Sequence, residues 1–402
     1  MYTFFMNIRP AICILAALLI ISCTGRGEND LERENLFSLD YGKMEDQLDL
    51  VQSPGSPFDT NTAIVMKNGF FYILNRTAGK LMKFNSYGDI VELYYNQDKN
   101  PDPVLLERES GNETQSTKRA FEYPFEDIRN FAVSSGEYLF VDDRVPEARR
   151  EYDGEMDAML DRIVLRFDRN GRLLDYIGQE GIGGTPFSYI DRIDIDIRDE
   201  IIVTTRNMRS WRVFWYTAEG RLISTIEIPL ATLPVPADTD YTVSLESIMP
   251  DTRARTLYLK VDYYGTGETG DYGYISSAIL VLHAETGIYS DTVPIPVHYR
   301  ESEEPAGFSD DRVKMLYELL GVAEGQFFFL MSPEDGPYYR LLIIDRTGVV
   351  HKRVRIELAN GSLYYRDMCV SFDGILSALL CLENSIEVVW WRSDRFLGGI
   401  EE

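Results

Sequence analysis

The amino-acid sequence predicts an all-β protein, a six-bladed β-propeller of four-stranded antiparallel blades. Two segments, Arg162–Gly178 and Trp211–Ile226, are near-copies in which an alternating apolar strand, a tight turn with Gly and a second strand follow one another. Between them, residues 193–197 alternate Ile and Asp with the period of two that a half-buried strand requires. A unit of four short strands that repeats along the chain is typical of a β-propeller.

Turn signals divide the chain into six such units. In the first unit we expect strands at 63–66, 70–74, 81–84 and 90–95. The first and third turns of the later units are expected at 135–136 and 168–171, 198–199 and 217–220, 251–254 and 284–287, 324–325 and 345–348, and 373–374 and 392–394. Pro-Phe pairs at 57–58, 124–125 and 186–187 stand shortly before inner strands and support this division.

Two segments need a closer reading. Residues 309–321 carry a helix-like start, apolar spacing and a final Gly, but their alignment with the other units favours a strand from Tyr317, with at most one helical turn before it. The sixth unit is expected to end in a short strand, Phe396–Ile400. Because an open sheet edge is a liability, we expect Leu36–Asp40 to pair with this unit and close the ring.

The N-terminus reads as a signal followed by a tether. Residues 11–21 are apolar except for Cys13, and such a run is too short to span a membrane core as a helix, which takes about 20 residues. The run ends Ile-Ile-Ser-Cys23, which resembles the lipobox of bacterial lipoproteins. That resemblance implies a signal peptide over 1–22, a lipid on Cys23, and a lipid-anchored place outside the cytoplasm in the bacterial cell envelope, periplasmic or at the cell surface. The polar composition that follows predicts a flexible tether over 23–35, and the repeated units predict a single propeller domain over 36–402. An ordinary secretory signal is the alternative.

Charge excludes one class of partner. The chain carries a formal net charge of −25, and removal of residues 1–22, which hold one Arg and no acidic residue, makes it −26. A polyanion repels nucleic-acid phosphates, so nucleic-acid binding is not expected.

Two cysteines, Cys369 and Cys381, remain after the signal and the lipidated residue are set aside. They flank Asp373-Gly374, which reads as a two-residue hairpin turn. Such a turn would place Cys369 opposite residue 378, so that Cys381 would point to the other sheet face. We therefore expect two buried thiols without a disulfide, although a longer loop would reverse this orientation.

The units resemble those of the NHL-like six-bladed propellers, a large bacterial group often found as lipoproteins. Segments Arg166–Leu174 and Ile177–Phe187 carry the resemblance, and the fourth unit departs most because its first turn lacks Gly. The resemblance implies binding of other molecules, since only a few propellers of this group are lactonases, lyases or peptidase-associated modules. The fold by itself does not decide the function.

Motifs with catalytic or cofactor chemistry are weak. The Gly265-Thr-Gly-Glu-Thr-Gly270 pattern lacks the helix that holds a dinucleotide and reads as a loop, so no cofactor is expected. Asp191, Asp194 and Asp196 lack the ligand set of a calcium loop and read as a solvated strand face, so no metal is expected either. The three histidines belong to no nucleophile–base motif.

Loop lengths are the most informative functional signal. In a four-stranded blade, the first and third turns lie on one face of the disc, while the second loops and the crossovers lie on the other. Every insertion belongs to the second set: residues 96–123, 142–159, 206–210, 263–274, 297–311 and 332–338. These loops and their edges carry Arg and aromatic residues of the kind enriched at binding hot spots, namely Arg206, Arg209, Trp211, Tyr263, Tyr264, Tyr272 and Tyr338.

Two functions follow as hypotheses. The favoured one is a non-catalytic, membrane-anchored binding or scaffold protein, which takes an unknown protein or small-molecule ligand through its long-loop face. The alternative is a propeller hydrolase or lyase, whose site would lie at the channel mouth around Arg129, Asp191, Arg192, Glu318 and Asp367.

Overall fold

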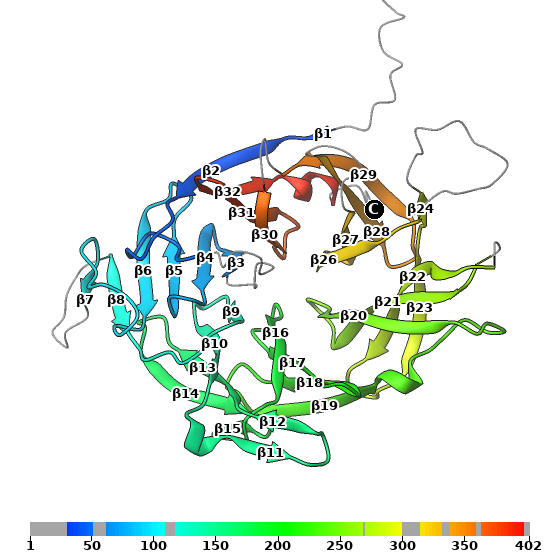
Figure 1. Cartoon of the computed structure of the whole chain (residues 1–402), viewed down its shortest axis with the longest axis horizontal. Coiled ribbons are helices and arrows are strands. Elements are labelled where there is room, and N and C mark those ends of the chain that lie inside the picture. Colours follow the sequence, from blue (N-terminus) through cyan, green and yellow to red (C-terminus); the bar gives the residue numbers. More distant parts are fainter. Residues whose placement is uncertain are drawn as a thin grey trace, which may run out of the picture.

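The computed structural model describes residues 30–50, 62–108, 117–267, 270–299, 314–331, 338–358 and 363–397. These residues form six sheets of four to six strands, which follow one another in chain order around a central opening (Figure 1). In each sheet one strand lies innermost and the strands that follow it in the chain lie further out, while the N-terminal β1 (Asp30–Leu31) and β2 (Arg33–Leu39) are the outermost strands of the last two sheets. The predicted class, an all-β propeller of small antiparallel sheets, is therefore confirmed.

The first three sheets are described here from the channel outward. Sheet 1 consists of β3 (Thr62–Lys67), β4 (Phe70–Asn75), β5 (Lys80–Phe84), β6 (Ile90–Tyr95), β8 (Arg119–Glu122) and β7 (Glu107–Arg108). Sheet 2 consists of β9 (Phe131–Val133), β10 (Leu139–Arg144), β13 (Arg162–Phe167), β14 (Leu173–Gly178) and β15 (Gly181–Ile182). Sheet 3 consists of β16 (Tyr189–Ile195), β17 (Ile201–Arg206), β18 (Ser210–Tyr216) and β19 (Leu222–Pro229).

The other three sheets complete the ring. Sheet 4 consists of β20 (Thr242–Pro250), β21 (Thr256–Thr266), β22 (Tyr272–His283) and β23 (Tyr289–Ile295). Sheet 5 consists of β26 (Tyr317–Ala323), β27 (Gln326–Met331), β28 (Tyr338–Asp345), β29 (Val350–Glu357) and β1 (Asp30–Leu31). Sheet 6 consists of β30 (Leu363–Val370), β31 (Leu376–Leu382), β32 (Ile386–Trp391) and β2 (Arg33–Leu39).

The remaining elements are short. Two-stranded sheets are formed by β11 (Glu151–Asp153) with β12 (Ala158–Leu160), and by β24 (His298–Tyr299) with β25 (Lys314–Met315). The 3-10 helices are η1 (Glu147–Arg149), η2 (Leu230–Thr232) and η3 (Ser393–Phe396). No helix in the described ranges is long and apolar enough to cross a membrane.

The expected turns explain why these strands pair as they do. Gly171 and Gly220, at the β13–β14 and β18–β19 turns, have φ angles of 79° and 84°, a region that glycine enters without strain. The Asp168 carboxylate accepts the backbone N–H groups of Asn170 and Arg172, so this turn is held by its own side chain. The Asp168–Gly171 prediction is confirmed as a hairpin turn.

The core is divided among the interfaces between neighbouring sheets. Six clusters of buried apolar side chains lie between successive sheets, including one between sheets 6 and 1 that closes the ring. Phe125 and Phe187, from two of the Pro-Phe pairs, are fully buried in these clusters. The third pair, at 57–58, lies outside the described residues. Each sheet therefore buries both of its faces.

The ring closes through the N-terminal strand. β2 pairs antiparallel with β32, from Arg33 opposite Trp391 to Leu39 opposite Ile386, which confirms the expected pairing with the sixth unit. The predicted last strand, Phe396–Ile400, is wrong over its described part, because Phe396 ends η3 and β2 takes the outer position instead.

The predicted tether, residues 23–35, extends too far. β1 already pairs parallel with β29 at Asp30 and Leu31, and β2 begins at Arg33. The segment is polar because these outer strands expose one side to solvent, so polarity did not indicate a flexible chain here. The signal peptide and Cys23 lie outside the described residues.

Two further sequence interpretations are confirmed. β26 begins at Tyr317, as expected, while the possible helical turn before it, up to residue 313, lies outside the described residues. In the glycine-rich pattern at 265–270, Gly265 and Thr266 end β21, and β22 follows from Tyr272, so a strand and not a helix comes after the glycines.

The cysteine prediction is correct about pairing and wrong about orientation. Both Cys369 and Cys381 are free thiols, and Cys381 is fully buried while Cys369 is partly buried. The turn before β31 is longer than two residues, so Cys369 lies opposite Ser377 rather than residue 378. The two thiols therefore share a sheet face, but their positions are four residues apart along the ladder, beyond the reach of a disulfide.

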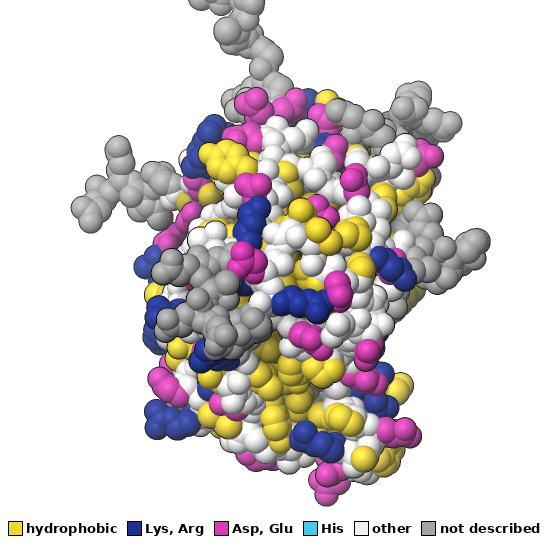
Figure 2. All heavy atoms as spheres, turned by 90° about the vertical axis from the view of Figure 1, so that its left-hand side faces the viewer, with side chains coloured by type: hydrophobic (Ala, Val, Ile, Leu, Met, Phe, Trp, Pro, Cys, Tyr) yellow, Lys and Arg dark blue, Asp and Glu magenta, His cyan; other side chains and the backbone are white. Residues whose placement is uncertain are grey.

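The outer surface carries interspersed charges. Figure 2 shows the side of the ring that carries sheet 1, where basic and acidic side chains alternate and hydrophobic side chains gather lower in the view.

Candidate functional site

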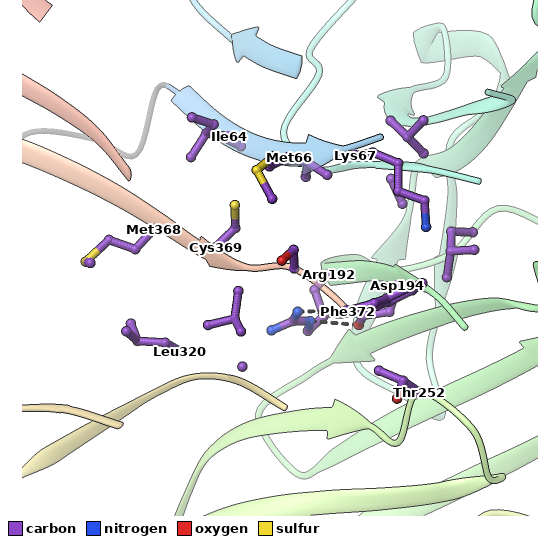
Figure 3. A pocket seen from close by; sticks show the side chains of 18 of the residues that line it. Ile64, Met66, Lys67, Arg192, Asp194, Thr252, Leu320, Met368, Cys369 and Phe372 are labelled. Atoms are coloured by element: carbon purple, nitrogen blue, oxygen red, sulfur yellow. Dashed lines mark hydrogen bonds and ion pairs between the residues drawn. The ribbon is translucent and has the colours of Figure 1, made fainter. Parts of the chain in front are cut away.

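The central channel contains a cavity of about 660 Å³ that is lined by the innermost strands of all six sheets (Figure 3). It extends from Asn130 and Asp191, near the starts of their strands, to Asn68, Thr252 and Phe372 in the short turns. The apolar part of its wall comes mainly from Ala63, Ile64, Met66, Phe131, Ile193, Leu320 and Val322. A concave cavity of this size, in which apolar side chains lie beside polar and charged ones, is a candidate ligand site.

Two neighbouring charged residues of β16 form an ion pair in the wall of the channel. The Arg192 guanidinium donates from Nε and Nη2 to the two oxygens of Asp194, both at 2.7 Å (Figure 3). Asp196, by contrast, is buried and accepts the N–H groups of Arg198 and Glu200 at the β16–β17 turn. The predicted solvated strand face is therefore wrong for these residues, because each carboxylate has a guanidinium or backbone partner.

Asp367 lies where β30 of sheet 6 meets β3 of sheet 1. Its Oδ2 accepts the Ile64 N–H at 2.6 Å, and two residues earlier the Tyr365 hydroxyl donates to the Thr62 carbonyl at 3.0 Å. Burial raises the pKa of Asp367 to about 7, although backbone N–H donors from Ile64 and Met368 favour the charged form. The channel therefore holds a carboxyl group that changes charge near neutral pH.

The short-turn end of the cavity holds a lysine. The Lys67 ammonium lies 4.0 Å from the centroid of the Phe372 ring, a cation–π contact (Figure 3). Burial lowers the pKa of Lys67, while the charges of Asp199 and Asp373 partly oppose this shift.

The short turns on this face are tied to one another. Asn68 donates to the Ser135 carbonyl at 3.5 Å, and Ser135 N–H donates to Asp199 at 2.7 Å. Ile197 N–H donates to the Thr252 carbonyl at 3.0 Å, which continues the series from sheet 3 to sheet 4. These polar groups hold neighbouring sheets together, and their hydrogen bonds are made to other groups of the protein.

The opposite mouth, on the long-loop face, gathers arginine and tyrosine. The Tyr189 ring lies within 5.6 Å of the Arg129 guanidinium and within 5.1 Å of that of Arg206. Arg206 also pairs with Asp191 at 3.1 Å and contacts the Trp211 ring. Since Asp191 lines the cavity, this cluster adjoins the channel.

The predicted binding residues fall into two groups. Trp211 and Tyr263 are 4% and 3% exposed and belong to the core between sheets 3 and 4, so their predicted contact role is wrong. Each side chain points into the interface between sheets 3 and 4, where residues of the neighbouring sheet help to bury it. The other five are at least partly exposed, in or near the ends of strands or, for Arg209, in the loop between β17 and β18: Arg206, Arg209, Tyr264, Tyr272 and Tyr338.

The predicted channel-mouth residues also divide. Asp191, Arg192 and Asp367 line the cavity, and Arg129 contacts Tyr189 beside it. Glu318 is exposed and pairs with Arg366 at 2.6 Å instead of lining the cavity.

Several long loops are themselves folded. The 96–123 insertion supplies β7 and β8, where β8 extends sheet 1 in parallel to β6, and the 142–159 insertion supplies the β11–β12 hairpin. Residues 332–337 and 300–313 lie outside the described part of the chain. The long and short loops lie on opposite faces, as the strand order requires.

Sequence reasoning missed Tyr189, Lys67 and Phe372. Tyr189 is the first residue of an inner strand and follows Pro186-Phe187, which is the signal that marks the long-loop end of such a strand.

In the ranges described, no group of three or more His, Cys, Asp or Glu is arranged to hold a metal ion.

Fold and site together define a β-propeller with a lined central channel. No protein-family model matches the chain, and no curated protein matches its sequence, so the NHL-like relationship stays a prediction.

Among solved structures, a polysaccharide lyase of family PL25, an ulvan lyase, is similar at 12% identity, with 90% of this chain and 84% of that chain covered and a TM-score of 0.42. An oxidoreductase (glucose dehydrogenase) of Thermus thermophilus is similar at 12% identity, with 90% of this chain and 99% of that chain covered and a TM-score of 0.41. The AfRom2 CNH domain is similar at 11% identity, with 90% and 98% covered and a TM-score of 0.38. None of these distant likenesses bears on the activity of this chain.

Proposed function

We propose that this protein is a non-catalytic binding protein whose ligand enters the central channel from the long-loop face. The observation that carries the proposal is the 660 Å³ cavity, which adjoins the Tyr189–Arg206 cluster through Asp191. Entry from this face is favoured because the short turns at the other end use their polar groups to join neighbouring sheets. The buried positions of Trp211 and Tyr263 move the proposed site from the loop surface to the channel mouth.

We further propose that the chain is a lipoprotein of the bacterial cell envelope, anchored through Cys23. The support is the apolar run that ends at Cys23, only seven residues before β1. One acyl chain gives only marginal membrane binding, with a constant of order 10⁴ M⁻¹, whereas two or more hold a protein firmly. A Cys23→Ser chain should stay uncleaved or become soluble, and a processed, membrane-bound Cys23→Ser protein would refute the anchoring.

Binding is tested with the chain from residue 24. A small-molecule screen by thermal shift should find ligands, and Tyr189→Ala should weaken them at least tenfold because Tyr189 lies at the mouth. The matched control is Tyr87→Ala, which removes an exposed tyrosine from the turn after β5 on the short-turn face. Equal losses from both variants, or a loss only from Tyr87→Ala, would contradict entry from the long-loop face.

A second function is favoured by one observation. A carboxyl group with a pKa of about 7 inside a cavity, as in Asp367, is suited to general acid–base catalysis. A propeller hydrolase or lyase would lose turnover in the Asp367→Asn variant while still binding its substrate. A ligand that is recovered chemically unchanged after prolonged incubation with the wild-type protein would favour the binding function.

A further inference from the structure

Four arginine side chains, two from strands of sheet 2 and two from the segments after β4 and before β9, converge on one carboxylate beside the long-loop mouth. Asp127 lies 2.8 Å from Nε of Arg76, 3.0 Å from Nη1 of Arg162, 3.1 Å from Nη2 of Arg129 and 3.7 Å from Nη2 of Arg144. Burial raises the pKa of Asp127, but the hydrogen bond from Arg76 and the arginine charges outweigh it and lower this pKa to about 2. This carboxylate therefore stays ionised throughout the physiological range.

Two further carboxylates pair with arginines of this group. Arg162 also pairs with Asp142 at 2.7 Å, and Arg144 also pairs with Asp161 at 3.0 Å. A further carboxylate, Asp143, accepts the backbone N–H groups of residues 126, 127 and 144, and no ion pair joins it to an arginine of this cluster.

Arg129, Arg144 and Arg206 are more exposed than the carboxylates that pair with them. The carboxylates of Asp127, Asp142 and Asp191 are only 17%, 0% and 22% exposed. The side chains of Arg129, Arg144 and Arg206 are 24%, 32% and 47% exposed. A charged group that approaches from solvent therefore meets guanidinium groups first, with their carboxylates underneath.

Tyr189 joins this cluster to the channel. It is 43% exposed and contacts the guanidiniums of both Arg129, in the segment before β9, and Arg206, at the end of β17. Cation–π contacts of this kind hold the guanidiniums in place without using their N–H donors. Guanidinium donors in a fixed fork are suited to bind carboxylate, sulfate or phosphate oxygens.

We propose that the arginine mouth, defined as Arg129, Arg144, Arg206 and Tyr189, binds an oxyanion group of the ligand, either carboxylate, sulfate or phosphate. This inference rests on the proposed binding function and names the chemical class of its ligand. The chain carries a net charge of −25, and exposed charges act over about 8 Å at physiological salt. The mouth would therefore select anionic ligands at short range, against the repulsion of the whole molecule.

The test uses isothermal titration calorimetry on the chain from residue 24, at low and constant ionic strength. The oxyanion probes are inorganic sulfate, inorganic phosphate and citrate, with spermidine as the probe of opposite charge. The Arg129→Gln/Arg206→Gln variant should bind the oxyanions at least tenfold more weakly than the wild type. Arg149→Gln is the matched control, because Arg149 is an exposed arginine of η1 that contacts Tyr176 outside the cluster, and it should leave binding unchanged.

Asp191→Asn separates a binding role from a purely structural one. Asp191 competes with the ligand for Arg206, so its neutralisation should raise oxyanion affinity several-fold if Arg206 binds the ligand. If Arg206 only holds the fold together, loss of its partner should leave affinity unchanged or lower it. Thermal unfolding of each variant confirms that it is folded.

Three results would overturn the proposal: no measurable binding of any oxyanion by the wild type, equal binding by all variants, or binding of spermidine instead. The ligand from the thermal-shift screen distinguishes failure of the oxyanion assignment from failure of the proposed binding function. A screened ligand that loses affinity in Tyr189→Ala but not in Arg129→Gln/Arg206→Gln would leave the channel-mouth function standing and remove the oxyanion assignment.

Discussion

The Asp367 carboxylate accepts the backbone N–H of Ile64 at 2.6 Å, and this hydrogen bond joins the last sheet of the ring to the first. On the same side of β30, Tyr365 donates to the Thr62 carbonyl. Alternate residues of β30 thus point toward β3 and bond to its open backbone edge, which has no neighbouring strand on the channel side. Because Asp367 also lines the cavity, ring closure and the channel share one titratable group.

The Asp367→Asn variant should make stability less sensitive to pH. The pKa of Asp367 is raised from 3.8 to about 7 in the folded protein, so the folded state holds this proton more tightly than the unfolded state. The contribution of the protonated Asp367 carboxyl to the free energy of unfolding is therefore fully present below pH 4 and is lost as the pH rises through about 7. The loss is at most about 4 kcal/mol, and it is smaller where channel water screens the charge. Urea unfolding at pH 5 and pH 8 should show the wild type losing stability relative to Asp367→Asn.

The control for this experiment is Asp373→Asn, which removes a carboxylate from the next turn and leaves the Asp367–Ile64 bond in place. It should follow the wild-type pH profile. A difference in the free energy of unfolding between wild type and Asp367→Asn that is the same at pH 5 and pH 8 would show that Asp367 does not titrate in this range.

Removal of the N-terminal strands should destabilise the ring. A chain that begins at residue 41 lacks β1 and β2, including buried Leu39 and the contact of Phe37 with Phe71 and Phe84. We expect a loss of several kcal/mol in the free energy of unfolding, the scale of a lost packed element. A chain that begins at residue 30 keeps both strands and is the control, and equal melting temperatures of the two chains would contradict closure by β2.

Trp211→Ala should act on stability and not on binding. Trp211 is buried between sheets 3 and 4, and truncation of such a side chain costs about 3–5 kcal/mol. Met208→Ala in the same hairpin removes a side chain that is 95% exposed and should change the melting temperature little. Unaltered unfolding of Trp211→Ala would show that Trp211 is not part of the core.

The strands and turns followed from the sequence because local chemistry specifies them. Gly171 and Gly220 mark turns that need a positive φ, and alternating residues such as Ile193 and Ile195 specify which side of β16 is buried. The ends of the chain were harder, because the outer strand of sheet 6 comes from residues more than 340 positions before its partner β32. Local pattern carries no information on that pairing.

The site could be predicted only in part. Inner strands carry Asp191, Arg192 and Asp367 to the wall of the channel, and their role as site residues stays a prediction. Burial of Trp211 and Tyr263 depends on packing against a neighbouring sheet, and convergence of Arg76, Arg129, Arg144 and Arg162 on Asp127 depends on three-dimensional placement of several strands and loops.

The two thiols should be unreactive in the folded protein. Burial raises the pKa of both Cys369 and Cys381 to about 12, so the reactive thiolate is scarce at neutral pH. In the chain from residue 24, a thiol reagent such as Ellman's should label both residues only after unfolding. Rapid labelling of the folded chain at pH 7 would contradict their assigned environment.

Binding at the long-loop mouth of the channel is tested most directly by hydroxyl-radical footprinting of the chain from residue 24, with and without a saturating ligand from the screen. The account predicts that the ligand protects Tyr189, which is 43% exposed at that mouth, and leaves the oxidation of Tyr87, 86% exposed on the opposite face, unchanged. Protection of Tyr87 with unchanged oxidation of Tyr189 would contradict it.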